Sequence, residues 1–167
     1  MVRRYWWLAG PPLLLAMSLK VGSSVEDPVR ALTGHYLSRT VASDGRRVDS
    51  VVEIVPIAAR HAYVHFDLHA ADGARCELTG IADAVGPALI YRASQRSSAP
   101  QCRITIRRQD RRLTYADAGN TCASLCSARD GFDGSMAWST RRRIADSAKL
   151  RTSQAFLDAV EEWRHLR

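Results

Sequence analysis

Residues 61–82 read HAYVHFDLHAADGARCELTGIA, and the order of apolar and polar residues in this stretch decides the fold class. The two kinds alternate strictly: Ala62, Val64, Phe66, Leu68 and Ala70 are apolar, whereas His61, Tyr63, His65, Asp67 and His69 form the more polar set. A period of two with one apolar face is typical of a half-buried β-strand. Ala-Asp-Gly at 71–73 predicts a turn, so a second strand is expected at residues 74–82.

The three histidines of this stretch raise the question of a metal site. On a helix, a spacing of four would place His61, His65 and His69 on one face, where two neighbours could share a zinc ion. On a strand, His61 and His65 lie roughly 13 Å apart, too far for one ion. His65, Asp67 and His69 remain neighbours on one face of the strand and could jointly face a cation. Solvent-facing polar residues are the commoner explanation, so we expect no metal and no other cofactor.

Further alternating segments, separated by turn residues, recur along the chain. They lie at residues 34–41, 48–55, 88–94, 102–109, 112–117 and 136–144. Together with the two strands above, they predict a mainly β domain at residues 24–150, an antiparallel meander closed into a small barrel. A two-sheet β-sandwich is the alternative.

The pattern changes after residue 150. Thr152 or Ser153 is a suitable N-cap, and Phe156, Val160 and Trp163 follow at helical spacing and form one apolar stripe. We therefore predict one C-terminal helix at residues 151–167, packed on the barrel.

The chain begins MVRRYWWLAGPPLLLAMSLKVGSS, which has the three parts of a secretory signal: a basic start, a short apolar run and small residues. Pro11 and Pro12 interrupt the run, which is also short for a membrane-spanning helix. We predict a signal peptide at residues 1–23, a periplasmic or secreted protein, and no stable membrane span after cleavage.

Cleavage would remove three positive charges and no negative ones, lowering the net charge from +7 to +4. The basic clusters at residues 107–112 and 141–143 lack the interleaved aromatic residues that single-stranded nucleic acids stack on. We expect no nucleic-acid partner. A solvated face, or attraction to an anionic cell surface, explains these clusters better.

The four cysteines, Cys76, Cys102, Cys122 and Cys126, form an even set that allows three disulfide pairings. Zinc sites usually have two pairs of closely spaced cysteines. This sequence has only one such pair, so structural disulfides are favoured. We predict the pairs Cys76–Cys102 and Cys122–Cys126, the second of which would close the short loop CASLC.

Recognisable catalytic motifs are missing. The sequence has neither GxSxG nor HExxH. Glu161 and Glu162 belong to the predicted terminal helix, and Asp130 and Asp133 stand beside glycines as turn-formers. We expect a protein that works by binding and has no catalytic residues. Because catalytic groups can assemble from distant residues, a cell-envelope hydrolase stays open as an alternative.

The most unusual stretch is DAGNTCASLCSARDGFDG, residues 117–134. A long loop of this kind in a small domain is often functional. A disulfide would cut the entropy lost when the loop docks on a partner, with Ala123, Ser124 and Leu125 forming a small rigid projection. The disulfide could equally serve only to hold the loop in place.

This loop, with CELTGIA (76–82), ALIYR (88–92) and CRITI (102–106), resembles small exported bacterial β proteins with disulfides, some of which are similar to periplasmic lysozyme inhibitors. Their closing motif is Cys, three residues, Cys-Gly-Ala-Arg, and then aromatic-Asp-Gly; here Ser127 stands at the glycine. The resemblance implies an envelope-binding or inhibitor protein whose loop blocks a protein partner, such as a lysozyme or another cell-wall hydrolase. On that interpretation Ala123, Ser124, Leu125 and Arg129 contact the partner, and Cys122–Cys126 holds them.

A lipocalin-like carrier is the other alternative. Gly34-His35-Tyr36 near the first strand, a meander barrel and a terminal helix resemble the lipocalin plan. An eight-stranded barrel can hold one small apolar ligand. The predicted inward residues are mostly medium and large aliphatic ones, however, which would fill such a barrel.

Overall fold

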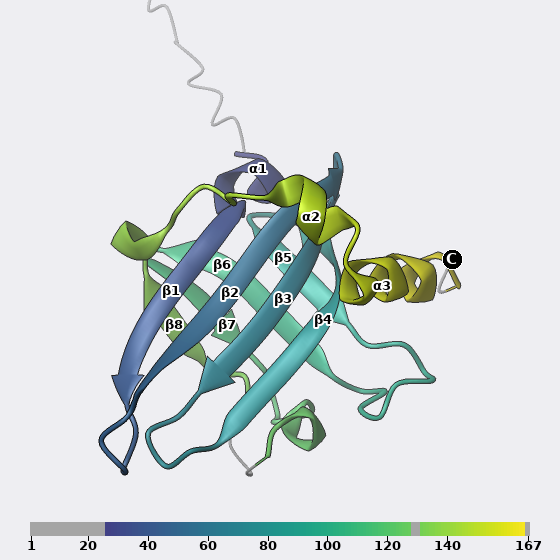
Figure 1. Ribbon diagram of the computed structural model, residues 1–167. Coiled ribbons are helices and arrows are strands. Elements are labelled where there is room, and N and C mark those ends of the chain that lie inside the picture. The colour runs from purple at the N-terminus through teal and green to yellow at the C-terminus, as the bar shows by residue number, and fades with distance from the viewer. Residues whose placement is uncertain (1–25, 128–130, 166–167) are drawn as a thin grey trace, which may run out of the picture.

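The computed structural model describes residues 26–127 and 131–165 (Figure 1). The predicted signal peptide at residues 1–23 and the predicted contact residue Arg129 lie outside these ranges. Within the described residues, no helix has both the length and the apolar character needed to cross a membrane.

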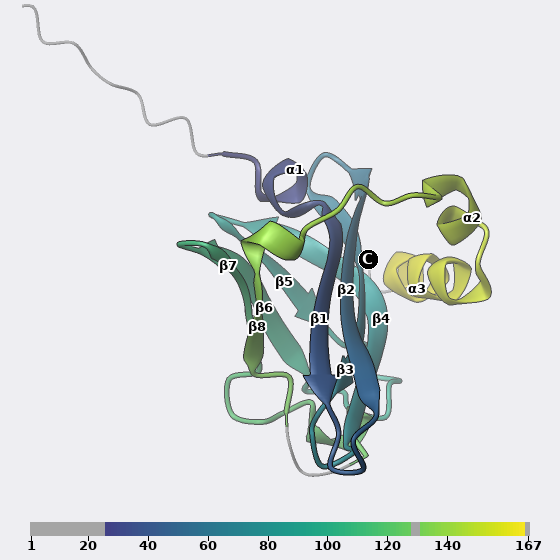
Figure 2. The same cartoon turned by 60° about the vertical axis from the view of Figure 1, so that its left-hand side comes forward.

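One eight-stranded antiparallel sheet forms the body of the protein, and each strand pairs with the next along the chain (Figures 1 and 2). The strands are β1 (Gly34–Val41), β2 (Arg47–Ala58), β3 (His61–His69), β4 (Arg75–Val85), β5 (Ala88–Arg92), β6 (Arg103–Gln109), β7 (Arg112–Ala116) and β8 (Gly134–Ala137). The sheet curves until β1 and the chain beyond β8 meet, where the backbones of His35 and Arg142 exchange two hydrogen bonds of 2.9 and 2.7 Å. The predicted antiparallel meander is confirmed, as a nearly closed barrel.

The alternation in β3 has the predicted orientation. Ala62, Val64 and Phe66 have no exposed surface and point into the barrel. The interior is filled by large side chains from the whole sheet, among them Tyr36, Ile54, Phe66, Leu89, Ile104, Ile106, Leu113 and Met136. Tyr91 lies against Gly80 on β4, where a side chain would collide with its ring. The interior is therefore a packed core.

A short helix, α1 (Pro28–Leu32), closes one end of the barrel, which we call the helix end. The Asp27 side chain caps α1 by accepting a hydrogen bond from the Val29 amide at 3.0 Å. Leu32 is buried in the core, and its carbonyl accepts a hydrogen bond from the Tyr36 hydroxyl at 2.9 Å. The sequence analysis did not predict this helix.

The last strand is shorter than predicted. Residues 136–144 were expected to be extended, but β8 ends at Ala137 and a 3-10 turn, η2 (Trp138–Thr140), follows. The chain turns there because Trp138 packs over the helix end, with its ring 5.7 Å from that of Tyr36. The Arg108 and Arg141 guanidinium groups lie 4.6 and 4.8 Å from the Trp138 ring centre.

The predicted C-terminal helix is confirmed, at residues 154–165, and a short helix that was not predicted precedes it. Asp146 caps the short helix α2 (Ser147–Arg151) by accepting a hydrogen bond from the Lys149 amide. The main helix, α3 (Gln154–His165), packs on the outer face of the sheet, where the Phe156 ring lies 5.0 Å from Tyr63 and the Trp163 ring 4.9 Å from His61. The more polar face of β3 is therefore partly covered.

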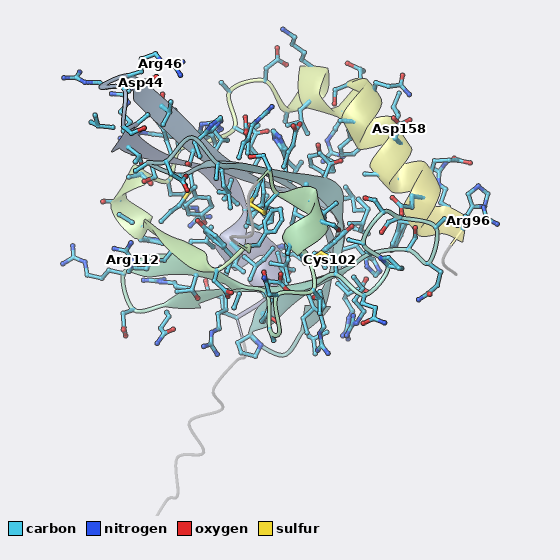
Figure 3. The ribbon with its side chains drawn as sticks, turned by 90° about the horizontal axis from the view of Figure 1, so that it is seen from below. Asp44, Arg46, Arg96, Cys102, Arg112 and Asp158 are labelled. Atoms are coloured by element: carbon cyan, nitrogen blue, oxygen red, sulfur yellow. A yellow bond between two sulfur atoms is a disulfide. The ribbon has the colours of Figure 1, made fainter. Side chains whose placement is uncertain are left out.

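The predicted disulfide pairing is wrong. The bonds are Cys76–Cys126 and Cys102–Cys122. Cys76 is on β4 and Cys102 directly precedes β6, so one strand separates them in the sheet order. Strands two apart are roughly 10 Å from each other, beyond the reach of a disulfide. Each cysteine instead bonds to the loop at residues 117–134, whose described residues, 117–127 and 131–134, lie at the opposite end of the barrel, the loop end (Figure 3).

This pairing makes a direct prediction for peptide mapping and stability. Digestion under non-reducing conditions with chymotrypsin, which cuts after Leu125 between the two loop cysteines, should release one pair of peptides linked through Cys76 and Cys126 and another linked through Cys102 and Cys122. The bonds span 50 and 20 residues, for which loop closure gives about 4 and about 3 kcal/mol of stabilisation. Denaturant unfolding of the C76A/C126A and C102A/C122A variants should show losses of this size. A peptide joining Cys76 to Cys102 would contradict the structure.

Candidate functional site

The loop at residues 117–134 is built around one short turn. The 3-10 turn η1 (Ala123–Leu125) lies between Cys122 and Cys126, and the two cysteines bond to different parts of the sheet. Beside β4, the Ser127 amide donates to the Arg75 carbonyl at 2.8 Å, and the Arg75 amide donates to the Ser127 hydroxyl at 2.8 Å. The loop thus pairs with β4 next to Cys76, outside the part of β4 that pairs with β5.

Asp117 holds the first half of the loop. Its carboxylate is 1% exposed and accepts hydrogen bonds from the Thr121 amide at 2.9 Å, the Thr121 hydroxyl at 2.7 Å and the Cys122 amide at 2.8 Å. The Asp117 amide donates to the Asp133 carboxylate at 3.0 Å, which joins the two ends of the loop. Three donors on one buried carboxylate make a rigid arrangement.

Phe132 anchors the second half of the loop. It has no exposed surface, and its ring meets Phe66 edge-on inside the barrel at 5.8 Å between centres. The roles of Asp117 and Phe132 are not predicted by the sequence pattern. The only available signal was their position in an unusually long loop, which does not show whether a side chain points inward.

The predicted contact residues differ in exposure. Ser124 is exposed, and its hydroxyl donates to the Ser98 carbonyl at 3.4 Å. Ala123 and Leu125 are half-buried, and Leu125 packs against the core. The expectation that a Cys122–Cys126 bond holds these residues is wrong, because one bond leads to Cys76 on β4 and the other to Cys102, just before β6. Ser124 is therefore the exposed residue of the turn, and we call it the apex.

A second polar site lies on the outer face, in a row across β1, β2 and β3. His35, Glu53 and His65 are register partners, and both histidines direct Nδ1 at the same carboxylate, at 2.9 Å from Oε1 for His35 and 3.4 Å from Oε2 for His65. This row borders a groove of about 730 Å³ below α2 and the start of α3. The row has no signal in the sequence because its members are far apart in the chain.

Hydrogen bonds from two histidines favour the ionised form of Glu53. The bond with His65, and then that with His35, holds the pKa of Glu53 below its usual value, although partial burial of the carboxylate acts in the opposite direction. Thr79 is the register partner of His65 on β4. Among the described contacts, however, none joins the Thr79 hydroxyl to either imidazole, so the row has acid–base groups without an activated nucleophile.

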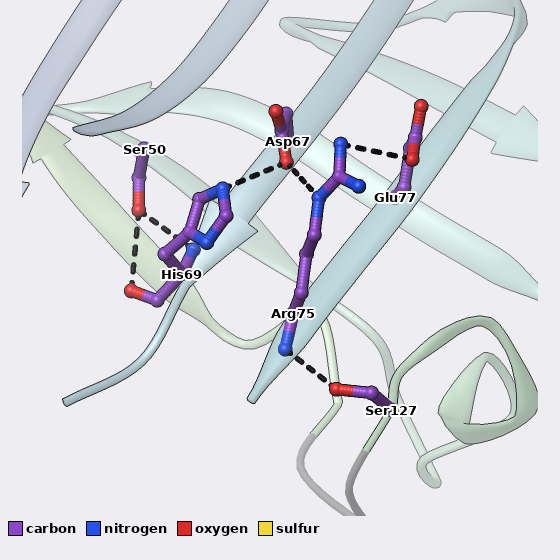
Figure 4. A network of polar contacts seen from close by, with 6 residues as sticks. All are labelled: Ser50, Asp67, His69, Arg75, Glu77 and Ser127. Carbon is purple, nitrogen blue, oxygen red and sulfur yellow. Dashed lines mark hydrogen bonds and ion pairs between the residues drawn. The ribbon is translucent and has the colours of Figure 1, made fainter. Parts of the chain in front are cut away.

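The predicted cluster of His65, Asp67 and His69 does not converge on one point. His65 bonds to Glu53, while Asp67 is 3.1 Å from Nε2 of His69 and 2.7 Å from Nε of Arg75 (Figure 4). The hydrogen bond and charge of Arg75 lower the pKa of Asp67. A guanidinium thus occupies the position that a cation would need. The described residues contain no group of three or more His, Cys, Asp or Glu side chains arranged to hold a metal ion.

No protein family, curated protein or solved structure matches this chain. Its class is therefore defined by the structure itself: an eight-stranded antiparallel barrel with a filled interior, a disulfide-bonded loop at one end and a helix on its outer face.

The row predicts a pH dependence of stability. Because the folded pKa of Glu53 is lowered, its ionised form stabilises the fold above the usual carboxyl pKa of about 4.3, and this contribution is lost as the pH falls through the folded pKa. Glu53→Gln should lower the free energy of unfolding at pH 7 by about 1–2 kcal/mol. Urea unfolding from pH 7 to pH 2.5 should show this difference shrinking at acidic pH.

Glu77→Gln is the matched control, since Glu77 is 54% exposed and pairs with Arg75 at the surface. An exposed ion pair contributes less than about 1 kcal/mol. A difference between wild type and Glu53→Gln that stays constant down to pH 2.5 would contradict the assignment.

Proposed function

We propose that this protein is an exported binding protein of the bacterial cell envelope. On this proposal, the loop end docks against a protein partner and blocks it, with a lysozyme or another cell-wall hydrolase as the partner class. The observation that carries the proposal is the η1 turn, which has a disulfide at each end leading to a different part of the sheet.

Rigidity is what this arrangement contributes to binding. Ordering a flexible loop costs roughly 1–2 kcal/mol per residue in backbone entropy, and a loop that is already fixed avoids this cost when it binds. Asp117 and the two disulfides fix residues 117–127 before any partner arrives, and Phe132 is anchored in the core. Ser124 at the apex is small and exposed, so a partner's cleft could close around the turn.

Export is supported by two independent features. Disulfides form and persist in oxidising compartments, and all four cysteines of the chain are paired. The basic and apolar composition of residues 1–23 has the form of a secretory signal. The periplasm or the extracellular space is the compartment that fits both.

The filled interior weighs against the lipocalin-like carrier. Tyr36, Phe66 and Phe132 lie inside the barrel without exposed surface, and the packed side chains around them occupy the space that a ligand would need. The hydrolase alternative lacks an activated nucleophile in the outer row. A protein that binds through its surface fits these facts better.

Inhibition assays test the proposal. Lysis of peptidoglycan by a set of acidic and basic lysozymes should be slowed by the protein for at least one enzyme. Acidic enzymes are the stronger candidates because a mature charge of +4 repels basic ones at long range. Ser124→Trp should weaken inhibition by about tenfold or more, which corresponds to about 1.4 kcal/mol of binding free energy.

Ser147→Trp is the control, because Ser147 is an exposed serine on α2 at the helix end. It should inhibit like the wild type. Inhibition that survives in Ser124→Trp would exclude the η1 turn as the contact, and failure to slow any lysozyme or other cell-wall hydrolase would exclude the proposed partner class.

A further inference from the structure

Four arginines line a groove at the helix end, far from the loop end. The groove has a volume of about 570 Å³ and lies between the end of β2 and the segment at residues 141–151, which crosses this end of the barrel (Figure 1). The four arginines are Arg141, Arg142, Arg143 and Arg151, and no described residue that lines the groove is acidic.

Arg142 and Arg143 also line the neighbouring groove together with Glu53, Glu77 and Asp146, but within the described part of the chain none of these carboxylates is ion-paired with them. Among the described residues, no Asp or Glu side chain forms an ion pair with Arg141, Arg142, Arg143 or Arg151. The nearby Asp146 accepts a hydrogen bond from the Lys149 amide as the cap of α2. Like charges gathered in one groove repel one another, and a bound anion would relieve this repulsion.

Backbone carbonyls hold three of the four guanidinium groups in place. Arg141 donates from Nε to the Thr33 carbonyl at 2.8 Å, and Arg151 donates from Nη2 to the Pro56 carbonyl at 2.7 Å. Arg142 donates from Nη1 to the Ser139 carbonyl at 3.0 Å.

The sequence also makes room for Arg141. A Cβ atom on Gly34 would lie 2.9 Å from Cγ of Arg141, so the glycine allows this side chain to lie against β1. Each guanidinium has five N–H donors, and the carbonyl contacts leave most of them available. These arginines are therefore oriented before a ligand binds.

We propose that this groove binds a phosphomonoester group. Arginine matches phosphate oxygens with pairs of parallel hydrogen bonds, and a phosphomonoester offers three acceptor oxygens and nearly two negative charges to several guanidinium groups at once. Val55, Pro56 and Ile144 give the groove an apolar part for the uncharged remainder of the ligand. The inference does not depend on the proposed inhibitory function, because the loop end takes no part in it.

Binding measurements with two probes test this site. Inorganic phosphate is titrated into the protein and followed by NMR, and vesicles of phosphatidylcholine with or without phosphatidic acid are tested by co-sedimentation. Arg142→Gln combined with Arg143→Gln should weaken binding by about tenfold or more, equivalent to about 1.4 kcal/mol. Both side chains are exposed, so the fold should be retained, and thermal unfolding checks this.

The matched control combines Arg103→Gln with Arg107→Gln, which removes the same charge from exposed positions on β6. It should bind like the wild type. Binding of free phosphate supports a soluble ligand, whereas binding only to vesicles that contain phosphatidic acid supports a lipid headgroup. An equal loss in both double variants would reduce the effect to general charge attraction and overturn the site, as would failure of the wild type to bind either probe.

Discussion

The packed interior of the barrel is the constraint on which the rest of the structure depends. Phe66 on β3 meets Tyr115 from β7 at 5.4 Å between ring centres and Phe132 from the closing loop at 5.8 Å. These contacts join the two sides of the barrel and one of its ends. Since side chains occupy the interior, sites for other molecules are confined to the ends and the outer face.

The two ends are closed by different chemistry. At the loop end, two disulfides and the buried Asp117 carboxylate fix an irregular segment against the strands. At the helix end, Trp138 packs on Tyr36, with the Arg108 and Arg141 guanidinium groups on its ring. The covalent closure suits a rigid contact surface. At the helix end, the arginines keep N–H donors that are accessible to solvent.

Much of the fold could be predicted from local periodicity. The alternation in residues 61–70 identifies β3 and the face of each residue, because orientation along a strand depends only on position. The disulfide pairing could not be predicted in the same way. It depends on β5 having five residues beside the eleven of β4, so that the loop can reach Cys76. Strand lengths of this kind follow from packing across the barrel.

The candidate sites also divide into residues that the local sequence reveals and residues that only the fold brings together. The cysteine-bearing loop and the arginines at 141–143 are visible as clusters in the sequence, so their positions could be found. The row of His35, Glu53 and His65 comes from three strands, and Arg151 reaches the groove through a carbonyl on β2. Neither arrangement has a local signal, because each depends on sheet register or on the path of the chain over the helix end.

The pairing of the loop with β4 has a consequence for the protein as a molecule in solution. Beyond the end of β5, the backbone amide and carbonyl groups of β4 face an open strand edge, and Cys126 and Ser127 pair with its first residues, Arg75 and Cys76. Open edges recruit strands from other molecules. The Cys76–Cys126 bond and the two hydrogen bonds between Ser127 and Arg75 keep this segment on the edge, which shortens the part of β4 open to pairing with another molecule.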